Sequence, residues 1–282
     1  MNKEIGPYQI VDLSPGRRIW VNTLELSWPS HTIYGLVEVD VTVARRFIAD
    51  HKVRTGETLS FAGFLTYCLA RAVDEDKSIQ AHRKGDRHLI LFDDVNVGLM
   101  VERKVGEKTA LMGHVIRAAN CKTYREIHDE IRKVQAEPVP PARGMPNWFR
   151  SVMLLPWPLS KLVIALLRMN SRRDPTIAVS MGGTVDITSI GMFGGGHSGW
   201  AVTPTPQPVG LAVGSISWKP VVVEERIEPR EILNLTVSFD HDIVDGGRAT
   251  RFVRRLVELI ESGYGLDEEE IHAEQATTSQ DR

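Results

Sequence analysis

Hydrophobic and polar residues alternate along several short segments of the chain. Successive side chains of a β-strand point to opposite faces, so this alternation predicts strands with one buried face. One more such segment, TVDITSI, precedes a glycine-rich stretch. The clearest segments are 32–42, 88–101, 109–118, 209–217 and 233–240.

Other segments repeat their hydrophobic residues every three or four positions, with charged residues between them. This spacing predicts amphipathic helices over 42–52, 60–74, 122–136 and 247–262. Strands and helices are interleaved without a regular strand-helix-strand repeat and without a GxGxxG turn. We therefore expect a two-layer α+β fold in which a mixed β-sheet carries helices packed on one side.

The two ends of the chain differ in composition from its middle. Residues 265–282, GLDEEEIHAEQATTSQDR, are acidic and polar, as solvated and disordered ends are. We expect an N-terminal arm over 1–19, one domain over 20–264 and a disordered tail over 265–282.

The segment 136–175 interrupts the pattern, because it opens with prolines, becomes strongly apolar and ends in a basic cluster. Charged residues and prolines break the apolar run too often for a membrane-spanning helix. The favoured interpretation is a core or subunit-interface helix that is kinked at 156–158. The alternative is a helix over 147–169 that lies on a membrane surface or binds an acyl chain, since Trp148 and Trp157 have basic neighbours.

Charge and cysteine content exclude several kinds of partner. The formal net charge of -2 provides no excess of Lys and Arg for binding phosphates along a strand, so no nucleic acid is expected. Cys68 and Cys121 lack CxxC or His spacing, so neither a metal site nor a disulfide framework is predicted. The amino terminus lacks the apolar core of a signal peptide, and we expect a cytoplasmic protein.

The segment SFDHDIVDGGRATRF, residues 238–252, carries the most informative chemistry. His241 follows a predicted strand, and Asp245, Gly246 and Gly247 form a turn before a predicted helix. An imidazole at such a junction is accessible to ligands, and its pKa suits a general base near neutral pH. The HxxxD spacing alone is frequent by chance and is more often structural, so the strand and the glycine turn are the stronger indication.

A second component of a catalytic site lies about fifty residues upstream, in GGTVDITSIGMFGGGHSGW. Thr188 and Ser189 lie at the end of the predicted strand, and the hydroxyl of either one can donate a hydrogen bond to an oxyanion. Acyl transfer requires such a donor in addition to a base. The glycine-rich loop lacks the Lys and Ser/Thr of a Walker motif, so it is a weak candidate for phosphate binding.

Together these residues resemble the catalytic domain of the dihydrolipoamide acyltransferases of 2-oxoacid dehydrogenase complexes, a family with the chloramphenicol acetyltransferase-like fold. HTIYGLVEVDVTVARRFI is similar to the family's opening strand, SFAGFLTYCLARAV to its first long core helix and FDDVNVGLMV to the strand that follows. GGTVDITSIGMFG and TPTPQPVGLAVGSI match later segments. SFDHDIVDGGRATRFVRRL contains the family's DHxxxDG signature, which is the most specific match.

The resemblance implies an acyltransferase catalytic domain over 20–264, with coenzyme A as a substrate and no residue yet assigned to bind it. His241 would deprotonate the thiol of coenzyme A or of a dihydrolipoyl group, and the thiolate would attack an acyl thioester directly. Thr188 would stabilise the oxyanion, with Ser189 beside it as the fallback.

The resemblance also implies an oligomer. Neighbouring subunits of a homotrimer share the active site in this family, so His241 and Thr188 would meet across an interface. Asp245 would be structural and paired with Arg17 or Arg18. The family's larger cages use an apolar carboxyl end, whereas this tail is acidic, so we expect a trimer.

Three features depart from the family pattern. Asp242 stands where the family often has a basic residue, the segment 136–175 exceeds the family's usual length there, and no lipoyl domain precedes residue 20. We therefore expect a stand-alone acyltransferase. The alternatives are the catalytic core of a 2-oxoacid dehydrogenase complex served by a separate lipoyl protein, and a non-catalytic trimeric scaffold. Condensation domains usually carry a doubled histidine, and Asp240 occupies that position here.

Overall fold

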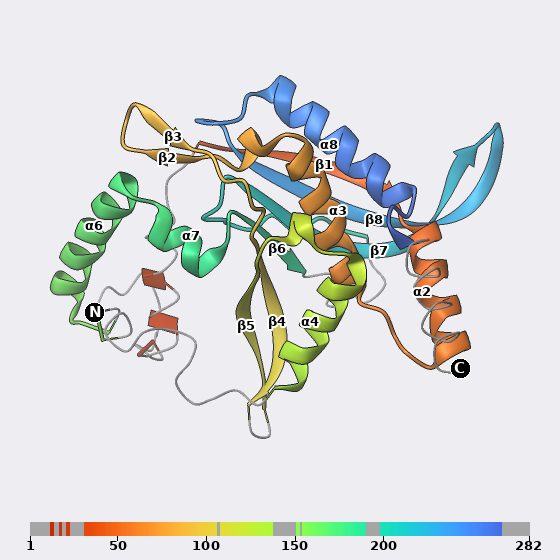
Figure 1. Ribbon diagram of the computed structural model, residues 1–282, viewed down its shortest axis with the longest axis horizontal. Helices are drawn as coiled ribbons and strands as arrows, with labels where there is room; N and C mark the ends of the chain where they lie inside the picture. Colours follow the sequence, from red (N-terminus) through yellow and green to blue (C-terminus); the bar gives the residue numbers. More distant parts are fainter. Residues whose placement is uncertain are drawn as a thin grey trace, which may run out of the picture.

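A six-stranded mixed sheet forms the centre of the structure, a computed structural model that describes residues 12–13, 17–18, 21–22, 31–105, 108–137, 151–152, 154–189 and 198–266 (Figure 1). Its strands are β1 (Thr32–Asp40), β4 (Val97–Val105), β5 (Lys108–Ile116), β6 (Val185–Ser189), β7 (Val209–Val223) and β8 (Arg226–Asp240). Their order is β1-β8-β7-β6-β4-β5. β6 is parallel to β4 and to β7, and the other pairs are antiparallel.

Helices cover one face of this sheet, which confirms the expected α+β architecture (Figure 1). The covering helices are α2 (Thr42–Thr55), α3 (Phe61–Glu75), α4 (Tyr124–Ala136) and α8 (Gly246–Glu261). Short 3-10 helices span Lys77–Gln80 and Ala119–Cys121. α6 (Trp157–Arg173) and α7 (Thr176–Gly182) lie beside the sheet, near a small hairpin of β2 (His82–Lys84) and β3 (His88–Ile90).

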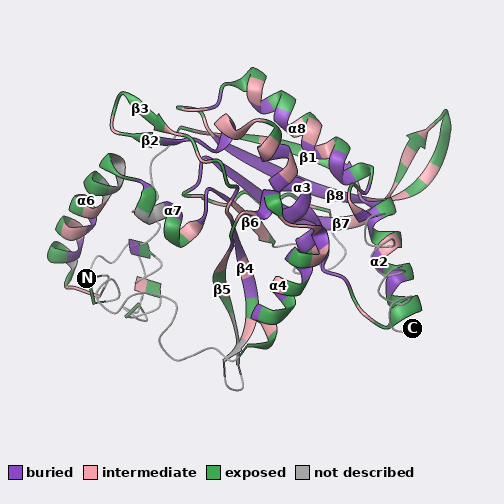
Figure 2. Cartoon of the chain, viewed as in Figure 1, coloured by how far each residue is buried: buried purple, intermediate pink, exposed green. Residues whose placement is uncertain are grey.

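α3 is the central helix of the core (Figure 2). Ser60 caps its first turn, because the Ser60 hydroxyl accepts a hydrogen bond from the Gly63 amide at 3.1 Å. Phe64, Leu65 and Leu69 are completely buried between the sheet and the neighbouring helices α4 and α8. Burial of such side chains stabilises the fold by about 1.5–3 kcal/mol each.

The sequence-based prediction of one strand over 88–101 is wrong. His88–Ile90 pairs with β2 in the small hairpin, and β4 begins only at Val97. Between these two strands, the Val95 amide donates to the Asn120 side-chain oxygen at 2.8 Å. A side chain therefore satisfies this backbone amide in place of a neighbouring strand. Alternation of hydrophobic residues does not reveal such a break, since the polar partner lies elsewhere in the chain.

The prediction of a kink at 156–158 is also wrong. Pro156 is the N-cap of α6, and Pro158 lies in its first turn. The first turn of a helix has no acceptors for its own amides, so a proline there costs no hydrogen bond. Among the described residues, no helix combines the length and the apolar character that crossing a bilayer requires.

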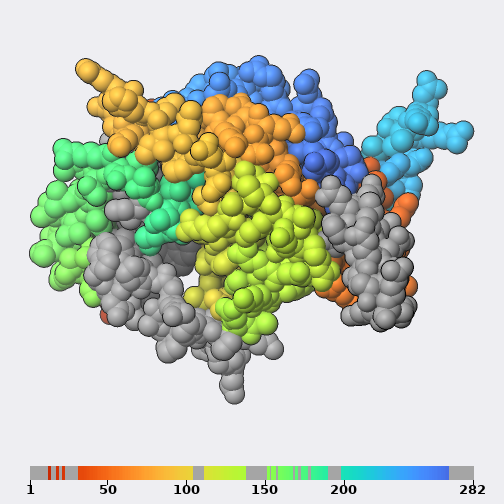
Figure 3. Space-filling model, viewed as in Figure 1, coloured from red at the N-terminus to blue at the C-terminus, as the bar shows by residue number. Residues whose placement is uncertain are grey.

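β7 and β8 continue as a two-stranded ribbon beyond the last residue of β1, Asp40, which pairs with Ile232. We call residues 217–231 the β7–β8 arm; it projects from the rest of the chain (Figure 3). Pro220 and Pro229 face each other in it. Three large apolar side chains of the arm are exposed: Trp218 (65%), Val222 (70%) and Ile227 (76%).

Candidate active site

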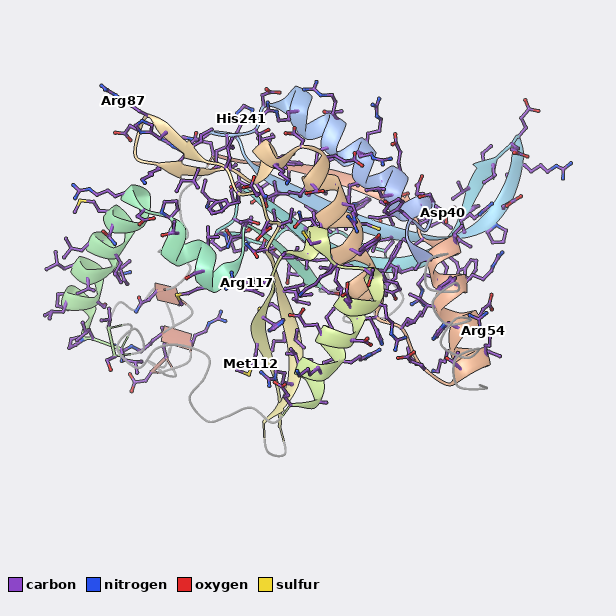
Figure 4. The ribbon with its side chains drawn as sticks, viewed as in Figure 1. Asp40, Arg54, Arg87, Met112, Arg117 and His241 are labelled. Carbon is purple, nitrogen blue, oxygen red and sulfur yellow. The ribbon has the colours of Figure 1, made fainter. Side chains whose placement is uncertain are left out.

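His241 lies in the turn that joins β8 to α8 (Figure 4). Its backbone amide donates to the His31 carbonyl at 2.9 Å, and the preceding Asp240 amide donates to the Pro208 carbonyl at 2.8 Å. The turn closes as the Val244 amide donates to the Asp240 carbonyl. The backbone is therefore held from both sides, while the imidazole itself is exposed to solvent and available to a substrate.

Asp245 fixes the start of α8. It is the N-cap residue, and its carboxylate accepts a hydrogen bond from the Arg248 amide at 2.8 Å. This bond and the nearby Arg248 and Arg251 charges hold the pKa of Asp245 below its usual value. Arg18, one of two arginines expected to pair with Asp245, donates instead to the carbonyls of Leu154 and Leu155.

Asp242 turns its carboxylate toward the β2–β3 hairpin. His31 Nδ1 lies 2.8 Å from one oxygen, and the Arg83 guanidinium donates to the other at 2.7 Å. These partners lower the pKa of Asp242, the His31 contact most strongly. The negative charge beside His241 is thus largely compensated. A hollow of about 380 Å³ opens at this place, and its lining carries both charges: Arg83, Arg87 and His88 together with Asp86, Leu89 and Asp242.

Thr188 lies near the end of β6, on the face of the strand that points away from the buried residues Val185 and Ile187. It is half-buried, and Ser189 after it is exposed. Thr188 therefore lies at the carboxyl end of an interior strand, where the chain passes from half-buried to exposed residues.

One chain does not bring His241 and Thr188 together. Thr188 pairs with Ala212 on β7, which pairs with Thr236 on β8, and His241 follows Thr236 by five residues. At strand spacings this offset is about 17 Å along the sheet and about 10 Å across it, so the two residues are nearly 20 Å apart. Within one chain, the two side chains are therefore too far apart to contact the same carbonyl group.

Residues 6–138 and 168–266 match the family model of the 2-oxoacid dehydrogenases acyltransferase (catalytic domain). The chain belongs to this family. A relative is the dihydrolipoyllysine-residue succinyltransferase component of the 2-oxoglutarate dehydrogenase complex of Bartonella vinsonii subsp. berkhoffii, 28% identical over 79% of this chain and 46% of the relative. The chain thus spans about half the length of the curated relatives it matches.

Solved acyltransferase structures share the fold. The dihydrolipoamide acetyltransferase of Azotobacter vinelandii aligns with a TM-score of 0.66 and 21% identity over 93% of this chain and 95% of that one. A chloramphenicol acetyltransferase aligns with a TM-score of 0.51 and 13% identity over 89% and 99%. The expected chloramphenicol acetyltransferase-like fold is confirmed.

Several residues that hold the candidate site in place were not predicted from the sequence. Arg83 lies 159 positions from its partner Asp242, and no local pattern connects them. The sequence did contain an indication for Asp186, because this residue precedes Thr188 by two positions and so lies on the same face of β6. The Thr205 hydroxyl lies 2.7 Å from Asp186 Oδ1, and burial raises the pKa of Asp186 to about 7.

Asp186 and Thr205 link β6 to the His241 turn. The Thr205 hydroxyl accepts a hydrogen bond from the Gln207 amide at 3.0 Å, and the next residue, Pro208, accepts from the Asp240 amide. Gly210 leaves room for this contact, since a Cβ there would lie 2.6 Å from Asp186 Oδ1. The same short segment therefore positions the strand of Thr188 and the turn of His241.

We expect Asp186→Asn to stabilise the protein at alkaline pH. The folded-state pKa is raised, so the carboxyl favours folding when protonated, and this contribution is lost as pH rises from about 4 through about 7. Asn keeps an acceptor for Thr205 and does not ionise. The gain in unfolding free energy should grow over this window to about 2–4 kcal/mol at pH 8, measured by urea unfolding.

Asp242→Asn is the matched control for that titration. Its pKa is lowered, so the same substitution there should remove stability above pH 4 rather than add it. A gain for Asp186→Asn that did not change with pH would contradict the assignment of a buried, protonated carboxyl.

Glu57, His128 and Asp129 are the described group whose ligand atoms lie close enough for a metal ion, within 4.8 Å of one another. The Arg125 guanidinium donates to both Glu57 oxygens, at 2.7 and 2.9 Å, and lowers the pKa of Glu57 to about 2. His128 Nδ1 accepts from the Ser60 amide at 3.0 Å. The lone pairs that a metal would need are already engaged, and we assign no metal to this group.

Proposed function

We propose that this chain transfers an acyl group between a thioester and a thiol, with coenzyme A or a dihydrolipoyl group as a substrate. The observation that carries the proposal is the exposed imidazole of His241 on a turn whose backbone is fixed on both sides. In the Azotobacter vinelandii enzyme, a serine, a histidine and an asparagine four residues after that histidine were investigated for their role in the catalytic mechanism. Asp245 has the same spacing from His241 here.

The reaction needs one base and one oxyanion donor. His241 takes the proton of the attacking thiol, and the thiolate forms a bond to the thioester carbonyl carbon. The carbonyl oxygen becomes an oxyanion that accepts a hydrogen bond from the hydroxyl of Thr188 of a neighbouring copy. The bond to the leaving sulfur then breaks, and the imidazolium returns its proton to the leaving thiolate.

The proposed assembly is a homotrimer with one active site at each interface. The separation of His241 from Thr188 within one chain supports a shared site. The β7–β8 arm supports it independently, because a two-stranded ribbon buries little of its own apolar surface and leaves Trp218, Val222 and Ile227 exposed. β1, an edge strand, also exposes large apolar side chains, those of Tyr34 and Leu36. Asp245 stays assigned to a structural role in this assembly.

The cytoplasm is the proposed compartment. Cys68 is buried and Cys121 is exposed, and both are free thiols. Unpaired cysteines are typical of a reducing environment, where disulfides are rare. Residues 20–264 remain the proposed catalytic domain.

The second candidate is the catalytic core of a 2-oxoacid dehydrogenase complex that receives acyl groups from a lipoyl domain on a separate chain. The relatives favour it, since they are named as dihydrolipoyllysine-residue succinyltransferase and lipoamide acyltransferase components of such complexes. Both candidates use the same base and the same chemistry, so the acceptor distinguishes them.

An acceptor panel tests the proposal. Purified protein is incubated with acetyl, succinyl, propionyl and isobutyryl coenzyme A, and with free dihydrolipoamide or a lipoylated domain in reduced form. Mass spectrometry detects the acylated thiol. We expect transfer to at least one acceptor, and a lipoylated domain that exceeds free dihydrolipoamide favours the complex. An intact trimer that transfers none of these groups would favour the non-catalytic scaffold.

A further inference from the structure

α6 has a buried face and, opposite to it, an exposed face that is apolar. Its inner face includes Ser160 and Ile164, each 4% exposed. Its outer face carries four large apolar side chains at spacings of three, four and three residues, which places them in one line along the helix. We call these residues the α6 stripe: Leu159 (53%), Leu162 (62%), Leu166 (51%) and Met169 (49%).

The family fold does not account for this stripe. The family model matches residues up to 138 and again from 168, so most of α6 belongs to a segment that the model leaves unmatched. The helix lies at the periphery, and its main contacts with the other described elements are those with α7 and β2 (Figure 3). A surface helix normally places charged residues on its outer side, so four aligned apolar residues there indicate an interaction surface.

The charge around the stripe decides between possible occupants. The α6 sequence, Trp157–Arg173, contains four basic residues and no Asp or Glu: Lys161, Arg168, Arg172 and Arg173. A second copy of α6 would bring these like charges together without carboxylates to compensate them. Anionic lipid headgroups compensate them, and α6 begins with Trp157, a residue type that favours the lipid-water boundary.

We propose that α6 docks in the plane of an anionic lipid surface, with the α6 stripe inserted among the acyl chains. The basic residues of α6 supply attraction to the headgroups, and the stripe supplies apolar burial. The helix attaches to the surface and does not span it. α6 contacts β2, whose Arg83 binds Asp242 beside His241, so the β2–β3 hairpin connects the docked helix to the proposed active site.

Vesicle flotation of the full chain tests this proposal. Phosphatidylcholine vesicles are compared with and without phosphatidylserine, at low and at high salt. We expect the protein to float with the phosphatidylserine vesicles at low salt, and high salt to release it because the Debye length shortens. Leu162→Gln with Leu166→Gln should reduce the bound fraction at least about tenfold, since both side chains are exposed and their loss leaves the core intact.

Leu91→Gln with Leu111→Gln is the matched control, because these leucines are 62% and 58% exposed elsewhere on the surface. It should float like the unaltered protein. Failure of the unaltered protein to float with anionic vesicles, or equal flotation of the stripe variant, would overturn the proposal. A stripe variant that sediments as a smaller oligomer, while the unaltered protein does not float, would assign the stripe to a second copy instead.

Discussion

His241→Ala is expected to lower kcat/KM for acyl transfer by about a thousandfold. The imidazole is exposed and its loss removes no core contact, so the thermal unfolding midpoint should stay unchanged. Without the base, the attacking thiol has to ionise unaided near neutral pH. Steady-state kinetics on the best acyl donor from the acceptor panel measure the effect, and raising the pH should restore part of the rate.

His31→Ala is the matched control for that variant. His31 is exposed, borders the same turn and binds Asp242, yet it has no assigned role as a base. Its replacement should change kcat/KM by less than about tenfold, because an exposed ion pair contributes only about 0–1 kcal/mol. If His31→Ala lost as much activity as His241→Ala, the base assignment would be wrong.

Thr188→Val is expected to lower kcat/KM by about 10²–10³-fold. Valine keeps the shape of threonine and removes the hydroxyl, so the substitution isolates the hydrogen bond to the oxyanion. Thr188→Ser restores a hydroxyl and should recover most of the rate. Ser189→Ala should have little effect; a large loss there together with an active Thr188→Val would move the oxyanion role to Ser189.

Mixed assemblies test whether two chains share each site. Chains with His241→Ala are co-expressed in equal amounts with chains carrying Thr188→Val, each variant being nearly inactive alone. Any mixed cyclic trimer has one interface that joins an intact histidine to an intact hydroxyl, so random assembly should restore about a quarter of the unaltered activity. No recovery, with mixed trimers present by mass spectrometry, would place the site within a single chain.

Short-range patterns were sufficient for much of the fold. The alternation in 32–42 and 233–240 marks the neighbouring strands β1 and β8, and the helical spacing in 60–74 marks the core helix α3. These patterns succeed because the buried face of a strand or helix must be apolar, so hydrophobic residues recur with the repeat of that element. The same patterns gave no warning that β7 and β8 continue into a projecting arm, since the arm is not buried within this chain.

The site was only partly accessible to sequence reasoning. The DHxxxDG signature located His241 and Asp245, because their spacing is set by one turn. The partners of Asp242 were not accessible, since His31 and Arg83 reach it from distant parts of the chain. The sequence showed only that Asp242 stands where the family often has a basic residue, whereas the structure pairs it with both side chains.

The facing prolines of the β7–β8 arm bear on how a chain with such an exposed ribbon avoids forming fibres. Proline has no amide hydrogen, so Pro220 and Pro229 fit opposite each other only where the backbone amides of both strands would point outward. Both outer edges of the ribbon consequently lack a donor at the same level. A third strand that added to either edge would lose a hydrogen bond there, which disfavours open-ended stacking of arms and leaves side-chain packing as the route to a closed assembly.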